Sequence, residues 1–289
     1  RATRDIVSRS INSEIRAGRA TPNGGVYIQM SHLGPDNVRK QFKGMVERCA
    51  DSGFDLAGDL VEVVPTAHYM MGGLIFKADC STELPGLFAA GEDTGGVHGA
   101  NRLGGNGVAN STVFGGIAGE EMANWVVSQS LQECNMDEVR ASIKAHEAPL
   151  ERSAGDIEEI RDALAECMWN DVGISRTKES LLQARTKLEQ LGQMLDQIGV
   201  GDIDRQYSIT WQDWMNLNNL ILVSKSVTEA ALSRENSRGA HYRDDFPQPG
   251  SLEESYFTAV QLGKDGLVIK NKPVQFTMIK PGQTILVEA

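Results

Sequence analysis

Glycine is concentrated in one stretch of this sequence, and that concentration limits what the middle of the chain can form. Directly after the short apolar run 86–90 come Gly91, Gly95, Gly96, Gly99, Gly104, Gly105 and Gly107. Glycine allows backbone conformations and close approaches that a Cβ atom prevents, and it weakens regular helices and strands. The stretch therefore predicts backbone that lies close against a ligand or another part of the fold.

The rest of the sequence predicts regular elements. Apolar residues at helical spacing, or long stretches rich in helix formers, predict helices over 1–19, 36–52, 109–130, 136–197 and 213–234. Alternating or continuous short apolar runs predict strands over 26–30, 60–64, 74–76, 86–90, 256–260, 266–269 and 274–278. These patterns predict a helical part over about 124–240 and, after a Pro/Gly linker at 247–250, a small β-rich tail.

Two helix details can be predicted more closely. Asp36 and Asn37 stand where the N-cap of the second helix is expected. Gly115, Gly116 and Gly119 recur at helical spacing in the helix that follows the glycine-rich stretch. Their spacing predicts tight packing of that helix on a sheet or a cofactor.

The charge balance narrows the classes of partner. The chain carries 28 basic and 39 acidic side chains, a formal net charge of -11. Nucleic-acid binding needs a basic face, so this balance argues against nucleic acid as the main partner. A small dicarboxylate stays compatible, because a few arginines can set the local field against the global charge.

Cysteine spacing and hydropathy exclude further classes. Cys49, Cys80, Cys134 and Cys167 are scattered and form no CxxC pair, which excludes a cysteine-built zinc or iron–sulfur site. They are expected to be reduced thiols in a cytosolic protein. No apolar run reaches the ~18 residues of a membrane span. We therefore predict no metal site in this chain.

Two side chains beside the glycine-rich backbone suit a short dianion. Arg102 offers a planar fork that binds a carboxylate through two parallel hydrogen bonds. His68 can donate to a second carboxylate or carry a proton. Taken singly, His68 fits a hydrogen-bonded core histidine better than a ligand-binding one, and Arg102 fits a surface or N-cap arginine as well as an anion-binding one. Their common glycine-rich setting favours a shared anion site.

Other residues of this region are candidates for holding a nucleotide. Glu92 follows the apolar run 86–90 and a glycine, where nucleotide-binding α/β folds hold a ribose hydroxyl. A helix that starts near Asn106 presents free backbone N–H groups to an anion or an electron-rich ring edge. No GxGxxG follows a strand anywhere in the sequence, so the usual pyrophosphate loop is absent.

Three of these motifs, in this order and spacing, carry a resemblance. They are His-Tyr-Met-Met-Gly-Gly at 68–73, Leu-Pro-Gly-Leu-Phe-Ala-Ala-Gly-Glu at 84–92 and His-Gly-Ala-Asn-Arg-Leu-Gly-Gly-Asn at 98–106. Together they resemble the succinate dehydrogenase/fumarate reductase flavoprotein family. Segments 3–9, 168–174 and 235–242 extend the likeness over nearly the whole chain, most weakly after about Phe246.

The resemblance implies a fold and a domain order. It implies an α+β or α/β fragment whose parts are the end of a capping domain, the C-terminal part of an FAD-binding α/β domain, a helical domain and a small β-rich segment. The implied boundaries are 1–70, 71–123, 124–245 and 246–289. The chain opens at Arg1 rather than at Met, which indicates a truncated start.

The same resemblance implies an activity and a set of roles. The family interconverts succinate and fumarate by hydride transfer at N5 of FAD. Arg4 is implied as the catalytic acid/base, and His68 and Arg102 as the residues that bind the substrate carboxylates. Glu92 is implied to hold the FAD ribose, and Asn106, Gly107 and Val108 to approach the flavin ring through backbone N–H groups.

An arginine in the acid/base role has a physical requirement. Free guanidinium hardly ever loses its proton. Arg4 can therefore act only in a proton relay, where the transfers in and out are nearly concerted, and a cationic site closed to water favours such a relay.

Partners and alternatives follow from the same likeness. The family implies a membrane anchor complex and an iron–sulfur subunit, which would place a cytoplasmic protein peripherally on the inner membrane. The family's glycine fingerprint and the histidine that attaches FAD are not in this sequence, so the fragment alone is expected to be inactive. L-aspartate oxidase, which usually has Met-Ala-Ser where this chain has Leu103-Gly104-Gly105, is one alternative; a non-catalytic docking module is the other.

Overall fold

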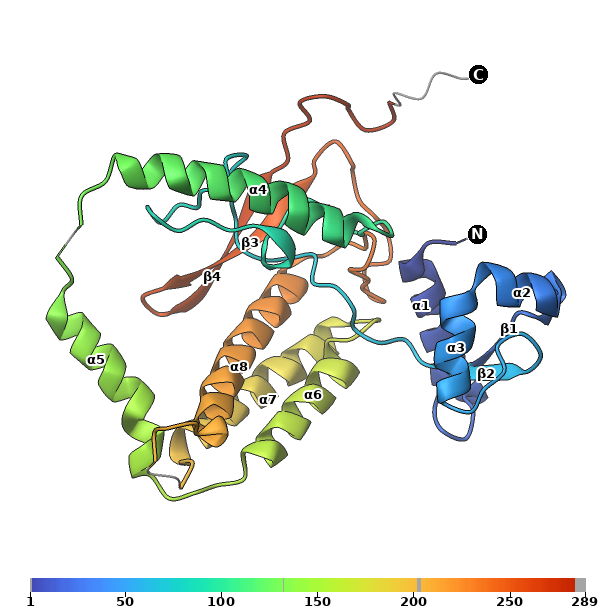
Figure 1. Cartoon of the computed structure of the whole chain (residues 1–289), viewed down its shortest axis with the longest axis horizontal. Helices are drawn as coiled ribbons and strands as arrows, with labels where there is room; N and C mark the ends of the chain where they lie inside the picture. Colours follow the sequence, from blue (N-terminus) through green and yellow to red (C-terminus); the bar gives the residue numbers. More distant parts are fainter. Residues whose placement is uncertain (1, 132, 202–203, 284–289) are drawn as a thin grey trace. The chain divides into compact units, whose positions relative to one another are not determined.

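The structure is a computed structural model that describes residues 2–131, 133–201 and 204–283 (Figure 1). Arg1 and residues 284–289, which belong to the predicted end segments, lie outside the described residues. The chain divides into two compact units, Arg1–His68 and Tyr69–Ala289, and each is described here by itself.

The first unit contains three helices and a two-stranded sheet. Helix α1 (Arg4–Glu14) leads through a short π-helical turn to β1 (Val26–Gln29), which pairs antiparallel with β2 (Leu60–Val63). Its core consists of Val38, Leu56, Ala57 and Val61, with Ile28, Met30, Phe42, Val46, Cys49 and Val63 packed around them. The two predicted strands and the first predicted helix are confirmed.

The predicted helix over 36–52 is two helices. α2 (Pro35–Gln41) and α3 (Lys43–Asp51) are separated by Phe42, whose backbone leaves the helical region (φ −118°, ψ 33°) while its side chain packs on the core. The N-cap prediction is also wrong. Gly34 takes that position with a φ of 82°, and Pro35 begins the helix because its fixed φ suits the first turn.

Three helices form the main core of the second unit. α6 (Ile157–Asp171), α7 (Lys178–Gln197) and α8 (Ile209–Ser233) lie side by side (Figure 1). Their buried faces carry Ile160, Leu164, Leu181, Leu188, Leu195, Trp214, Leu217 and Ile221. Side-chain oxygens of Asp156, Thr177 and Ser208 cap the three N-termini, which stabilises the first turns. α5 (Met136–Glu147) precedes the three helices.

Helix α4 (Asn106–Val127) follows the glycine-rich stretch and begins a few residues earlier than predicted. It is apolar around most of its circumference, yet only Asn110 and Ala118 are fully buried. Gly115, Gly116 and Gly119 are not buried with Asn110 and Ala118. In the described part of the chain, they have open space where a Cβ atom would point. The described residues therefore do not pack tightly on these glycines, and packing on a cofactor stays a prediction.

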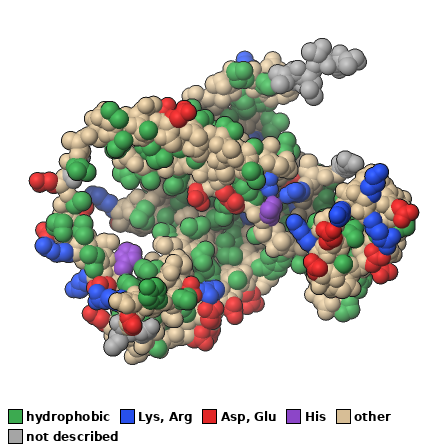
Figure 2. Space-filling model, in the orientation of Figure 1, with side chains coloured by type: hydrophobic (Ala, Val, Ile, Leu, Met, Phe, Trp, Pro, Cys, Tyr) green, Lys and Arg blue, Asp and Glu red, His purple; other side chains and the backbone are tan. Residues whose placement is uncertain are grey.

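Exposed hydrophobic side chains lie along the rest of α4. Val108, Val113, Val126 and Val127 are each more than half exposed. Figure 2 shows hydrophobic side chains over the part of the surface that this helix forms. No helix among the described residues combines the length and the apolar character that crossing a membrane requires.

The predicted strands over 74–76 and 86–90 are wrong. Only single bridges form there, from Leu74 to Thr94 and from Ser81 to Phe88. Gly86 and Gly91 have φ values of 84° and 87°, a left-handed conformation that a strand does not accommodate, so the extended run cannot continue at either end.

The C-terminal part contains a β-hairpin. β3 (Tyr256–Gly263) pairs antiparallel with β4 (Gly266–Pro273) along its whole length, which confirms two of the three strands predicted there. The predicted strand over 274–278 is not formed. Among the described residues, this sheet consists of β3 and β4 alone.

A buried arginine closes the C-terminal end of α8. Arg243 is fully buried, and its Nη1 donates to the carbonyls of Ala231, Leu232 and Arg234 at 3.0, 3.2 and 3.4 Å. Its Nε and Nη2 donate to the two carboxylate oxygens of Asp245 at 2.8 and 2.7 Å. The guanidinium thus satisfies carbonyls that the helix leaves without partners.

Beside this cap, a neutral histidine makes stability depend on pH. Nδ1 of His241 accepts from Arg176 at 2.9 Å, and its Nε2–H donates to the carbonyl of Arg234 at 3.2 Å. Burial lowers the pKa of His241 to about 4, and the charge of the neighbouring Arg176 acts in the same direction. The folded protein therefore resists a proton that the unfolded chain binds near pH 6.5.

We expect the unfolding free energy to fall by about 3 kcal/mol as pH drops from 6.5 to 4 because of His241 alone. The stability that His241 contributes is fully present above pH 6.5 and is lost by about pH 4. Asp245, whose pKa is lowered to about 2 by Arg243, affects stability only below pH 4. Urea unfolding at several pH values measures it. In His241→Asn this part of the pH dependence should disappear; an unchanged slope would contradict the assignment.

Candidate functional site

The glycine-rich backbone of the second unit folds into closely packed loops. The short 3₁₀ turn Gly91–Asp93 packs on α4, and the backbone around Leu74 pairs with it through Asp93, Thr94 and Gly95. A Cβ atom on Gly73 would overlap with the carbonyl of Asp93, so this approach requires glycine. The prediction that these glycines permit close approach is thus confirmed for Gly73.

Tyr69, His98 and Asn110 form a hydrogen-bonded cluster in these loops. The Tyr69 hydroxyl lies 3.1 Å from Nε2 of His98, and Nδ2 of Asn110 donates to that hydroxyl at 3.3 Å. The same Nδ2 donates to the carbonyl of Gly91 at 3.1 Å. Asn110 is 4% exposed, and its Oδ1 is buried without a hydrogen-bond partner. The cluster joins the start of α4 to the loop that precedes it.

Arg102 lies on this cluster. Its Cζ is 4.3 Å from the centre of the Tyr69 ring, and its backbone N–H donates to Sδ of Met71 at 2.9 Å. Nη1 donates to the carbonyl of Leu103 at 3.3 Å, whereas Nε is buried without an acceptor. Among the residues that the structure describes, no carboxylate pairs with this guanidinium. A half-buried cation without an anion is suited to binding one.

The residues predicted for the cofactor lie in the same unit. One carboxylate oxygen of Glu92 accepts the backbone N–H of Met70 at 2.8 Å, which orients the otherwise exposed side chain. Gly105 caps α4 with a φ of 85°, and Asn106, Gly107 and Val108 form its first turn. The N–H groups of a first helical turn lack partners within the helix and form its positive end. Here the N–H of Asn106 donates to the carbonyl of Leu103 at 3.3 Å.

These residues fit a flat, electron-rich group. Gly105 has open space where a Cβ atom would point, and Asn106 and Val108 are exposed. A Cβ on Gly107 would lie 2.9 Å from Cε2 of Tyr69, so glycine at this position leaves room for the Tyr69 ring. The start of α4 is therefore open at Gly105, beside the exposed side chains of Asn106 and Val108.

Arg4 and His68 belong to the first unit. Arg4 is the first residue of α1 and is exposed, and His68 is the exposed last residue of its unit. The structure brings Arg102, Glu92 and Gly107 together around Tyr69. Arg4 and His68 belong to the other compact unit, so their convergence with Arg102 stays a prediction.

Sequence reasoning missed Tyr69, His98 and Asn110. Two of them were inside the motifs that were singled out, at 68–73 and 98–106, and Asn110 follows four residues later. A polar residue at the start of an apolar helix was the available signal for Asn110. Its pairing with Tyr69 spans 41 residues and had no signal in the sequence.

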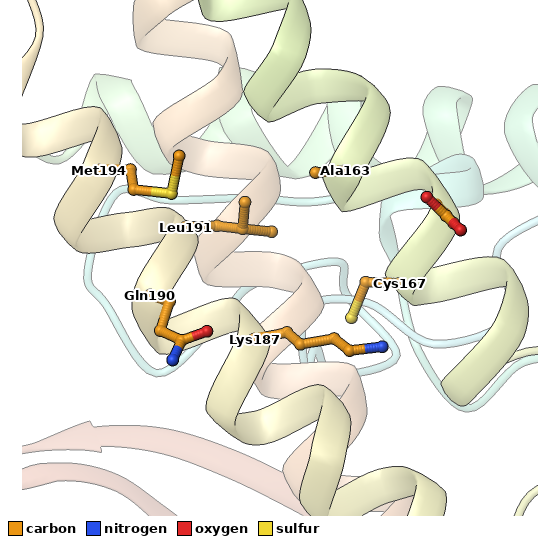
Figure 3. A pocket seen from close by; sticks show the side chains of 7 residues that line it. Ala163, Cys167, Lys187, Gln190, Leu191 and Met194 are labelled. Carbon is orange, nitrogen blue, oxygen red and sulfur yellow. The ribbon is translucent and has the colours of Figure 1, made fainter.

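A hollow between α6 and α7 is a separate feature. It has a volume of about 260 Å³ and is lined by Ala163, Glu166, Cys167, Lys187, Gln190, Leu191 and Met194 (Figure 3). Burial raises the pKa of the Cys167 thiol to about 11, and Nζ of Lys187 already pairs with Asp171 at 2.7 Å. The thiol is protonated at neutral pH and the lysine is paired, so the hollow does not suit a dianion.

Two family models match the chain. The family described as FAD binding domain matches residues 1–108. The family described as Fumarate reductase flavoprotein C-term matches residues 161–285. The first match contains Arg102 and Glu92, and the second contains most of α6, all of α7 and α8, and the β-hairpin.

Individual relatives agree with these matches. The fumarate reductase (CoM/CoB) of Methanothermobacter marburgensis has a subunit that is 41% identical over 86% of this chain and 45% of its own length. L-aspartate oxidase of Synechocystis is 31% identical over 85% of this chain and 46% of its own length. The solved Mycobacterium smegmatis Sdh1 complex in the apo form superposes with a TM-score of 0.85 at 32% identity, over 96% of this chain and 48% of that chain. The chain spans about half the length of the relatives it matches.

Proposed function

Because this chain belongs to the family of succinate dehydrogenase and fumarate reductase flavoproteins, we propose that it forms the dicarboxylate-binding part of an FAD-dependent enzyme that interconverts succinate and fumarate. The observation that carries the proposal is the state of Arg102. Its guanidinium is half-buried, lies on an aromatic ring and has a buried Nε without an acceptor. A substrate carboxylate would supply the missing anion.

Charge and geometry favour a two-headed acid. A carboxylate that accepts two parallel N–H bonds from Arg102 offsets the desolvation of the guanidinium. His68 precedes Tyr69 in the chain and would donate to the second carboxylate. Arg4 would exchange a proton with the substrate carbon. Three such groups would concentrate positive potential on a dianion despite the net charge of -11.

FAD is the cofactor that the family match indicates. When bound, it supplies the hydride acceptor or donor of the reaction. Glu92 would accept a hydrogen bond from its ribose, and the first-turn N–H groups of Asn106, Gly107 and Val108 would face the ring edge. Arg102 would polarise the carboxylate next to the reacting carbon, which makes that carbon more electrophilic.

Partner subunits extend the proposal. Electrons that enter or leave the flavin need a carrier, and we infer a membrane anchor complex and an iron–sulfur subunit for this role. Such partners would hold the flavoprotein at the cytoplasmic face of the inner membrane. The finer division into parts 1–70, 71–123, 124–245 and 246–289 also stays a proposal.

Steady-state assays of the complete flavoprotein with bound FAD test the function. We expect oxidation of a reduced dye by fumarate, or reduction of the dye by succinate, with kcat/KM at least ~100-fold above that for L-aspartate. The cationic residues disfavour the ammonium group that distinguishes L-aspartate from succinate. Faster oxidation of L-aspartate under air would instead support the function named for the Synechocystis relative.

A further inference from the structure

Tyr69 contacts Arg102 through one face of its ring and is held by other residues at its edge and hydroxyl. Cζ of Arg102 lies 4.3 Å from the ring centre, and the His98 ring meets the Tyr69 ring edge-on with centroids 5.3 Å apart. A guanidinium stacked on an aromatic face is attracted by the ring quadrupole. Tyr69 is therefore a direct support of the arginine.

Asn110 and His98 both contact the Tyr69 hydroxyl. The carbonyl of Gly91 can only accept, so the Asn110 amide must turn its Nδ2 toward it, at 3.1 Å. The same Nδ2 donates to the Tyr69 hydroxyl at 3.3 Å. The hydroxyl also lies 3.1 Å from Nε2 of His98, and that nitrogen lies 3.3 Å from the same Asn110 Nδ2. Asn110 and His98 thus both restrain the Tyr69 ring through its hydroxyl.

This arrangement orients Arg102 without neutralising it. A carboxylate partner would hold the guanidinium equally well but would cancel the charge that a substrate needs. An aromatic face supplies attraction and leaves the N–H groups available. The unpaired Nε of Arg102 agrees with this, because the ring contact leaves that donor without an acceptor.

We propose that Tyr69 is the positioning residue for Arg102, and that Asn110 and His98 hold the Tyr69 ring in place. The inference rests on the proposed role of Arg102 in binding a substrate carboxylate. Tyr69 acts through the arginine and contributes no chemistry of its own.

Malonate, a dicarboxylate without a reducible double bond, tests the proposal in the complete FAD-loaded enzyme. Its Kd is measured by flavin difference spectroscopy, and KM for fumarate in parallel. We expect Tyr69→Leu to raise the malonate Kd by about 3- to 30-fold. Tyr69→Phe, which keeps the ring but loses both hydroxyl contacts, should raise it less. Tyr27→Leu, at an exposed tyrosine of β1, is the matched control and should leave it unchanged.

The decisive comparison places Tyr69→Leu and Tyr69→Phe in an Arg102→Gln background. If Tyr69 acts only through Arg102, Tyr69→Leu should then have no further effect on malonate Kd. An equal loss in both backgrounds, or no loss when Arg102 is present, would overturn the inference while leaving the role of Arg102 intact. If Arg102→Gln itself leaves malonate affinity unchanged, the proposed function of Arg102 fails and the inference fails with it.

Discussion

Replacing Arg4 with glutamine is expected to lower kcat for fumarate reduction by about 10²- to 10⁴-fold while FAD stays bound. Glutamine keeps a polar side chain of similar reach but cannot exchange a proton. If Arg4 moves the proton to the substrate carbon, its loss affects the transition state more than ground-state binding. Malonate affinity should therefore change far less than kcat.

The position of Arg4 allows an effect on turnover to be separated from an effect on stability. The side chain is exposed at the first position of α1, where the helix dipole disfavours a positive charge. Removing the charge should not destabilise the first unit. Arg16→Gln, at an exposed arginine of the following turn, is the matched control and should keep full turnover. Retained activity in Arg4→Gln would remove Arg4 from the proton relay.

Replacing Arg102 with glutamine is expected to weaken binding of malonate and fumarate by about 2–5 kcal/mol. The substitution removes the only charge that the described residues place on Tyr69, and it leaves the substrate carboxylate without a bidentate partner. Arg102→Lys should recover only part of this affinity, because an ammonium neither forks nor stacks as guanidinium does. Titration of the flavin spectrum with malonate measures both variants.

A second arginine provides the control for Arg102. Arg140 lies in α5 and pairs on the surface with Asp137, so Arg140→Gln removes the same charge outside the Tyr69 cluster. It should leave dicarboxylate affinity unchanged. Equal affinity of Arg102→Gln and the unaltered enzyme for malonate would remove Arg102 from the binding site.

The helical part of the fold was predictable because its signals are local. The cap at Thr177 and the apolar spacing from Leu181 to Leu195 lie within one helix and need no knowledge of distant residues. The same holds for the β3–β4 hairpin, whose strands are joined by a short turn. Propensity and burial agree in these segments, so local patterns were sufficient.

Predictions failed where neighbours override local preference. The apolar run 86–90 has the composition of a buried strand, but Phe88 forms only one bridge and Gly86 lies in the left-handed region. The helix over 36–52 breaks at Phe42, whose side chain packs on the core of the first unit. Composition shows that a run is apolar, whereas pairing and packing partners decide its backbone conformation.

By itself, the sequence determined the order of the motifs, the helical character of the second unit and the candidates Arg4, His68, Glu92 and Arg102, because residue type and spacing are local properties. It did not divide the predicted helical stretch 136–197 into α5, α6 and α7. The tertiary structure alone decided that Arg102 stacks on Tyr69 and that Asn110, 41 residues away, fixes that ring. Contacts of this kind depend on how loops close, and loop closure is set by packing and backbone conformation across the whole unit rather than by any single segment.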